Sequence, residues 1–165
     1  MRKWGMLLAM AAIVFGTFSA SEARGQALIQ FGPQLTLVDF EDLGIGIRGD
    51  YALGDALGLE EEFIRYMKLS ADVNYILEGS DATTLHFNVN GLIPFEVDLA
   101  FVPYAGAGLN HVRSSFEGSS SNFSGLNLLG GAMFGLADLP AFVQVQYSTS
   151  GLGFLSVSFG VLFGG

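Results

Sequence analysis

Residues 153–163 read Gly-Phe-Leu-Ser-Val-Ser-Phe-Gly-Val-Leu-Phe and alternate between two kinds of side chain. Every second position of 155–163 is large and apolar, whereas Ser156, Ser158 and Gly160 between them are polar or small. This alternation predicts a β-strand with one apolar face. The chain shows no amphipathic helix to cover that face, but a lipid bilayer can cover it. Because hydrocarbon does not tolerate an open sheet edge, we expect this segment to be the last strand of a closed barrel.

The composition also favours a membrane protein. Of the 165 residues, 50% are hydrophobic and 14% are charged, and the mean hydropathy is +0.46. Soluble domains have about 25% charged residues, so this chain lacks the polar cover of a small soluble globule, and the same numbers exclude disorder. The length fits a single domain. The absence of cysteine excludes a disulfide scaffold or zinc ribbon, and a net charge of −9 excludes nucleic acid as a natural partner.

The N-terminus has the features of an export signal. Two basic residues precede the apolar run 6–18, and small residues follow it. The run is shorter than the roughly 20 residues that a membrane-spanning helix needs. We therefore expect residues 1–23 to be a signal peptide, cleaved after Ala23 or as late as Ala27. The exported mature chain, residues 24–165, is then one β-barrel domain.

The same period-2 alternation recurs along the mature chain. Eight segments carry it, close to the ~10 residues of a transmembrane strand, namely residues 29–37, 45–53, 67–75, 84–90, 104–110, 126–135, 141–148 and 153–163. No charged residue follows Asp138, so hydropathy alone would allow a transmembrane helix. Gln144, Gln146 and Ser148 share one face of a strand, whereas a helix would scatter them. The sequence thus predicts an all-β fold, an eight-stranded antiparallel up-and-down transmembrane β-barrel.

Turn-forming residues separate these segments at two alternating ends. Residues 41–44, 78–81, 114–124 and 150–153 are expected at one end, and residues 55–62, 94–100 and 137–140 at the other. Among the first group, 114–124 is predicted to be a long loop. Pro33 lies inside the first segment and removes a backbone donor, so we expect a β-bulge there.

Charged side chains gather on the inward faces of three consecutive strands. They are Arg48, Asp50, Lys68, Asp72 and His86. The neighbours expected from antiparallel pairing about residues 58 and 80 are Asp50 with Lys68, Arg48 with Ser70 or Asp72, and Asp72 with His86. Since eight strands enclose a space that side chains can fill, we interpret these residues as a salt-bridged polar network in the lumen. A proton or ion path and a small ligand site are the alternatives.

A second polar group lies on the outward face, where the fifth strand ends. His111, Arg113 and Ser115 alternate there with Val112 and Ser114. Arg113 could contact the phosphate of a lipopolysaccharide headgroup. The group also faintly resembles the His-x-Ser pair of outer-membrane lipid A deacylases, but its serine is displaced by two residues, which separates two groups that must hydrogen-bond for nucleophilic catalysis. An ordinary solvated strand end is the third interpretation.

Residues 103–109 read Pro-Tyr-Ala-Gly-Ala-Gly-Leu, and residues 140–148 read Pro-Ala-Phe-Val-Gln-Val-Gln-Tyr-Ser. Both stretches resemble the small outer-membrane β-barrels of Gram-negative bacteria, the OmpA, OmpX and OmpW kind. The resemblance covers essentially the whole mature chain and implies a location in the outer membrane. It also implies contact with outer-membrane lipid and lipopolysaccharide, and insertion by the barrel-assembly machinery. Members usually end in an aromatic residue that this machinery recognises, a role that here would fall to Phe163, ahead of two glycines.

We therefore predict an outer-membrane β-barrel with a structural or barrier role, a side-chain-plugged lumen and little or no pore activity. The sequence shows no complete catalytic triad signature, metal-ligand cluster or phosphate loop, so we expect a monomer without enzyme activity, cofactor or metal. The alternatives are a lipid-modifying enzyme that uses His111, a narrow porin, and a soluble lipocalin-like binder. Outward apolar faces argue against the soluble binder, because a soluble barrel places polar residues outside.

Overall fold

The computed structural model describes residues 29–58, 66–78, 82–95, 97–137 and 139–164. Its elements are β1 (Ile29–Val38), β2 (Asp42–Ala52), α2 (Leu53–Ala56), β3 (Lys68–Leu77), β4 (Thr83–Pro94), β5 (Phe101–Phe116), β6 (Ser119–Leu136), β7 (Leu139–Ser148) and β8 (Phe154–Val161). None of the helices in these residues is long and apolar enough to cross a membrane. The expected signal peptide and its cleavage positions lie outside the described residues.

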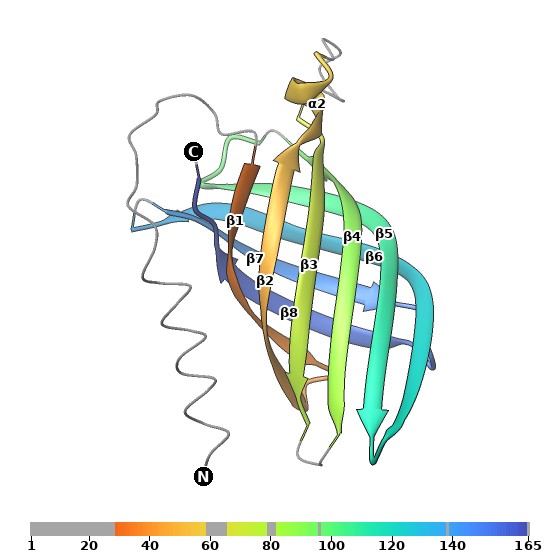
Figure 1. Ribbon diagram of the computed structural model, residues 1–165. Helices are drawn as coiled ribbons and strands as arrows, with labels where there is room; N and C mark the ends of the chain where they lie inside the picture. The colour runs from red at the N-terminus through yellow and green to blue at the C-terminus, as the bar shows by residue number, and fades with distance from the viewer. Residues whose placement is uncertain (1–28, 59–65, 79–81, 96, 138, 165) are drawn as a thin grey trace.

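The eight strands form one closed barrel (Figure 1). Each strand pairs antiparallel with its neighbours in sequence, and β1 also pairs with β8, so the sheet has no free edge. Such a barrel satisfies the backbone hydrogen bonds of every strand within the sheet. The predicted eight-stranded antiparallel up-and-down fold is confirmed.

The connections alternate between two ends of the barrel. We call one the turn end, because the short links β1–β2, β3–β4, β5–β6 and β7–β8 lie there, and the other the α2 end, where the C-terminus also lies (Figure 1). The predicted long loop at 114–124 is wrong. Most of it is strand, and β5 and β6 are joined by Glu117 and Gly118, with φ of 47° and 83°. Positive φ at both positions suits the twist of a tight hairpin, and the surrounding serines suggested a loop because serine favours turns.

Closure of the barrel depends on the seam between β1 and β8. A continuous run of residue pairs starts at Gln34, and Phe31 and Phe163 extend it by exchanging backbone hydrogen bonds of 2.9 and 2.7 Å. Pro33 lies between these pairs and has no N–H to donate. The predicted β-bulge at Pro33 is wrong, because β1 keeps one unbroken register with β2 through the pair Pro33–Ile47. The proline removes a donor from one ladder and leaves the register intact.

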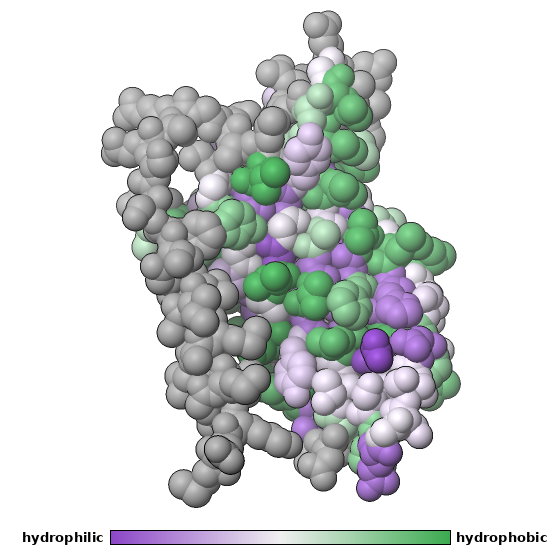
Figure 2. All heavy atoms as spheres, viewed as in Figure 1, coloured by the Kyte–Doolittle hydropathy of each residue, from purple (hydrophilic) through white to green (hydrophobic). Residues whose placement is uncertain are grey.

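The two faces of the barrel wall differ in polarity. Side chains alternate between lumen and exterior along each strand, and the lumen positions are the buried ones. The exterior exposes apolar side chains from all eight strands, such as Leu35, Ile47, Leu69, Val89, Leu109, Leu128, Val145 and Phe159. Figure 2 shows hydrophobic side chains across the middle of the visible face and more polar ones toward the turn end. This arrangement is typical of a barrel with lipid around its middle.

Candidate functional site in the lumen and at the outer rim

Polar side chains from every strand fill the middle of the lumen. The buried ones include Gln34, Thr36, Arg48, Asp50, Ser70, Asp72, Asn74, His86, Asn88, Asn90, Asn110, Asn127, Gln144, Gln146, Ser148, Ser156 and Ser158. Within the described residues, every buried side-chain nitrogen and oxygen atom has a hydrogen-bond partner. An unpaired buried polar group would cost about 1–3 kcal/mol, so complete pairing makes this filling compatible with a stable barrel.

Arg48 and Asp50 form an ion pair at the centre of the lumen. Arg48 Nε lies 2.7 Å from Asp50 Oδ1 and Nη2 lies 2.9 Å from Oδ2, so the carboxylate accepts two parallel hydrogen bonds. The strand register places Arg48 opposite Asp72, as expected, but the guanidinium turns along its own strand to Asp50. The expected Asp50–Lys68 pairing is wrong, because Asp50 lies opposite Ser70. The link between β2 and β3 covers residues 53–67, and a link of this length does not fix the register of the two strands in advance.

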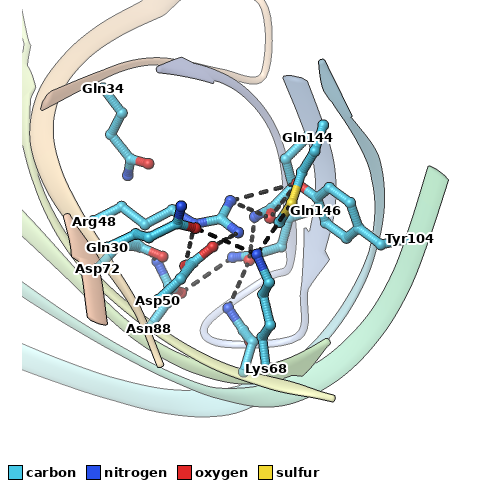
Figure 3. Close-up of polar contacts among 12 residues, drawn as sticks. Gln30, Gln34, Arg48, Asp50, Lys68, Asp72, Asn88, Tyr104, Gln144 and Gln146 are labelled. Atoms are coloured by element: carbon cyan, nitrogen blue, oxygen red, sulfur yellow. Dashed lines mark hydrogen bonds and ion pairs between the residues drawn. The ribbon is translucent and has the colours of Figure 1, made fainter. Parts of the chain in front are cut away.

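The Arg48 side chain crosses the lumen to the opposite wall. Its Nη1 atom donates to Gln144 Oε1 at 3.0 Å and lies 3.4 Å from the Tyr104 hydroxyl. The guanidinium also lies over the ring of Phe142, with Cζ 4.0 Å from the ring centroid, a cation–π contact. Figure 3 shows Arg48 extending from β2 toward Gln144 and Tyr104. One side chain thus connects β2 with β5 and β7.

Asp72 is bound by amides and not by a cation. Its Oδ1 atom accepts hydrogen bonds from Asn74 Nδ2 at 2.6 Å and Asn88 Nδ2 at 2.8 Å. Among the residues described, Arg48–Asp50 is the one ion pair. The expected contact between Asp72 and His86 is absent from these interactions: Asp72 lies opposite Asn88, and the His86 ring packs on Phe154 at 4.7 Å between centroids, nearer the turn end. An apolar ring on β8 therefore takes the place that the sequence suggested for a carboxylate.

Lys68 lies near the α2 end and forms no ion pair within the described residues. It begins β3, and its Nζ atom contacts Gln30 Oε1 at 3.3 Å and Met133 Sδ at 3.6 Å. Both partners are neutral. Lys68 is therefore a half-buried cation at one mouth of the barrel, and it does not pair with Asp50 as expected.

An amide network occupies the lumen between the ion pair and the turn end. Asn88 Oδ1 accepts from Asn110 at 2.8 Å, from Asn127 at 3.0 Å and from Gln146 at 3.1 Å. Asn127 Oδ1 in turn accepts from the Ser148 hydroxyl at 2.6 Å. These residues stand at lumen positions in the sequence pattern, but their partners come from four different strands. The alternation of side chains predicts which residues face the lumen, but it does not predict their hydrogen-bond partners on other strands.

Apolar side chains also face the lumen on both sides of the polar network, a feature that the prediction from sequence did not include. Leu92, Tyr104 and Leu129 form a buried cluster with Met133 against it, at the α2 end of their strands. Near the turn end, the buried apolar residues are Val38, Ile76 and Val112. Their place at lumen positions of the alternation is the signal in the sequence that could have identified them. The polar network thus has a buried apolar cluster on its α2 side and single buried apolar side chains on its turn side.

The polar group predicted on β5 lies on the outer surface. His111 and Arg113 are exposed and face outward. His111 does not pair with Ser115; its Nδ1 atom lies 2.9 Å from Ser124 Oγ, on the neighbouring strand β6. Its ring also lies beside Phe87, with centroids 6.3 Å apart. The sequence does not predict this partner, because the prediction places Ser124 in a loop at residues 114–124.

The described residues contain no group of three or more His, Cys, Asp or Glu side chains that could hold a metal ion. The described part of the lumen offers one ion pair, one amide-bound carboxylate and one lysine whose close contacts are neutral. These residues can stabilise the barrel by contacts across the lumen. In the described part of the lumen they form neither an acid–base pair suited to catalysis nor a metal-binding group.

No known protein family and no curated protein matches this sequence. Solved structures do match its shape. The N-terminal β-barrel domain of Pseudomonas aeruginosa OprF superposes with a TM-score of 0.60 at 12% identity, covering 85% of this chain and 100% of that one. Neisserial surface protein A, NspA, superposes with a TM-score of 0.54 at 17% identity, covering 82% and 96%. The chain has the fold of the small outer-membrane β-barrels.

The same fold also occurs in the outer membrane enzyme PagL, with a TM-score of 0.53 at 16% identity, over 82% of this chain and 99% of that one. At such identities the likeness concerns the fold alone. The predicted resemblance to small outer-membrane barrels is confirmed at that level. Because the fold includes an enzyme, it does not decide whether this chain is catalytic.

Proposed function

We propose that the chain is a monomeric β-barrel of the bacterial outer membrane, with a structural or barrier role and little or no pore activity. The observation that carries the proposal is the bridged lumen, in which Arg48 binds Asp50 on its own strand and Gln144 across the axis. Amides, hydroxyls and buried apolar side chains occupy other lumen positions. Ions and water would have to break this network to cross.

The membrane location is supported by the polarity of the wall. Leu128 is 69% exposed on the outward face, while Gln34 and Asp72 are 5% and 6% exposed inside. A soluble lipocalin-like barrel needs the opposite arrangement, so that alternative is not supported. The apolar exterior would contact outer-membrane lipid, with lipopolysaccharide at the turn end if this end faces the cell exterior.

Cell fractionation tests the membrane location. The mature protein should fractionate with outer membranes, and unboiled samples should migrate differently on gels because the closed barrel resists detergent. A soluble barrel would instead be recovered from the periplasm, which would contradict the proposal. Planar-bilayer recording tests the closed lumen: the refolded wild type should carry no steady current. A steady, weakly selective current would contradict the closed lumen and would identify the protein as a narrow porin.

A second candidate function, ester hydrolysis, is favoured by the contact between His111 Nδ1 and Ser124 Oγ. In such a reaction Ser124 Oγ would attack an acyl carbonyl, His111 would take its proton and return it to the leaving alcohol, and water would hydrolyse the acyl-serine. Within the described residues, His111 has Ser124 and Phe87 as partners and no carboxylate to orient its ring. We therefore favour the non-catalytic role.

Fatty-acid release from vesicles containing phospholipid and lipopolysaccharide separates the two functions. The wild type should release none above background. Release that is lost in Ser124→Ala and kept in Ser115→Ala would identify an enzyme, because Ser115 makes no contact with His111 that could activate it.

We further propose that the barrel-assembly machinery recognises Phe163. The residue closes the seam by pairing with Phe31, so its side chain stands at the end of the last strand. Phe163→Ala should lower the amount of folded barrel in the membrane, whereas the nearby outward change Val161→Ala should have a smaller effect. Unchanged assembly of Phe163→Ala would place the signal elsewhere.

A further inference from the structure

The outward face of the eight strands is almost free of charge. Among its positions, His111 and Arg113 are the sole Asp, Glu, Lys, Arg or His residues on any of the eight described strands. Both lie on β5, toward the turn end. Arg113 is thus the one Lys or Arg on the outward faces of the described strands, in a protein with a net charge of −9, so it is not part of a general basic surface there.

Four side chains form a compact group there. The β5–β6 register places Arg113 opposite Asn122 and His111 opposite Ser124, all on the outward face. Opposed residues in a ladder have Cβ atoms about 4.5–5.5 Å apart, and successive outward residues of one strand lie about 7 Å apart. We call His111, Arg113, Asn122 and Ser124 the outer-rim cluster.

The outer-rim cluster is rich in hydrogen-bond donors that lack acceptors. Within the described residues, the Arg113 guanidinium makes no hydrogen bond or ion pair, although it has five N–H donors. Asn122 is exposed and adds an amide donor. When His111 Nδ1 accepts from Ser124, the remaining ring nitrogen carries the proton and can donate outward. The matching ligand is an anion with several acceptor oxygens, which describes a phosphate group.

The cluster also lies at the border between apolar and polar surface. Leu109 and Leu126, the pair directly before it on the α2 side, are 63% and 62% exposed. Beyond it, Ser115 pairs with Ser120 and with Thr83. In a transmembrane barrel such a border marks the depth of the lipid headgroups.

We propose that the outer-rim cluster binds the phosphate of a membrane lipid in the leaflet at the turn end. Arg113 donates two parallel hydrogen bonds to the phosphate oxygens, and Asn122 donates a further one from β6. The acyl chains lie along Leu109 and Leu126. This proposal rests on the membrane-spanning role proposed above. A lipid is favoured over free phosphate because apolar surface adjoins the donors on one side.

Native mass spectrometry of the refolded full mature chain can test the site. The protein is loaded with equal amounts of phosphatidic acid, whose headgroup is a phosphate monoester, and phosphatidylcholine. Wild type should retain phosphatidic acid in preference. Arg113→Gln should lower this preference about tenfold, the size expected for losing a charge-assisted hydrogen bond, and Arg113→Lys should fall between them because it keeps the charge without the fork.

Glu117→Gln is the control for general electrostatics, because it shifts the net charge by one unit in the opposite direction on the same hairpin and leaves every donor of the outer-rim cluster in place. Retention by this variant should equal that of wild type, and added inorganic phosphate should not displace the lipid. Equal retention by Arg113→Gln, no preference in wild type, or displacement by inorganic phosphate would each overturn the site. Heat-dependent gel mobility is measured in parallel: a barrel that folds in lipid but shows no preference refutes the site alone, whereas failure of all variants to fold in lipid refutes the proposed membrane role.

Discussion

The two walls of the lumen are chemically different. The wall formed by β1–β4 carries Arg48, Asp50, Lys68, Asp72 and His86. The wall formed by β5–β8 has no Asp, Glu, Lys, Arg or His at its lumen positions in the described residues, and it supplies amides, hydroxyls and aromatic rings instead. Neutral side chains of the second wall therefore take the place of water around charges of the first wall. Gln144, Tyr104 and Phe142 surround a guanidinium that would otherwise need water.

The largest effect should come from removing the cation of the first wall. Arg48→Met leaves the buried Asp50 carboxylate without its partner, and we expect the free energy of unfolding in urea to fall by about 3–5 kcal/mol. The double variant Arg48→Met/Asp50→Leu should lose less, because no buried charge is left unpaired. Equal losses in the single and double variants would show that the ion pair does not control stability.

The next largest effect on stability should come from the uncharged wall formed by β5–β8. Gln144→Leu removes the acceptor 3.0 Å from Arg48 Nη1, and we expect a loss of about 1–3 kcal/mol in the same unfolding measurement. The matched control is Gln34→Leu, which removes an equally buried glutamine that donates to neutral Asn74 at 2.7 Å. Its loss should be about 0.5–1.5 kcal/mol. If the control lost as much as Gln144→Leu, the second wall would have no special role in solvating Arg48.

The smallest effect should come from the carboxylate that lacks a cation. Asp72→Asn keeps the oxygen that accepts from Asn74 and Asn88, so stability should change by less than about 1 kcal/mol. Asp50→Asn is a change of the same kind on the neighbouring strand. It should lower the free energy of unfolding much more, because it leaves the buried Arg48 guanidinium without a carboxylate partner. Similar losses in the two variants would contradict the distinction between a paired and an amide-bound carboxylate.

The alternation of side chains was sufficient to predict the fold and the two faces of each strand. It placed Gln34, Asp72 and Gln144 in the lumen because period 2 leaves one choice of face once the apolar side meets lipid. The partners of Arg48 could not be predicted in the same way. They depend on the register across a link of fifteen residues, 53–67, and on the rotamer that turns the guanidinium to its own strand.

The outer rim shows a second limit of pattern reading. The contact between His111 and Ser124 requires knowing that a two-residue turn at Glu117–Gly118 continues both strands. The serines around it have turn-forming chemistry, and a membrane barrel can extend such residues beyond the lipid as a solvated hairpin. Local propensity therefore favoured a loop where cross-strand pairing makes strands.

Steady conductance in a planar bilayer, compared between the refolded wild type and Arg48→Ser/Asp50→Ser, tests the closed lumen most directly. The wild type should carry no steady current, because Arg48 joins Asp50 to Gln144 across the axis. The variant shortens both side chains without leaving an unpaired charge, so it should fold and leak. Large, open, weakly selective channels in the wild type would contradict the account.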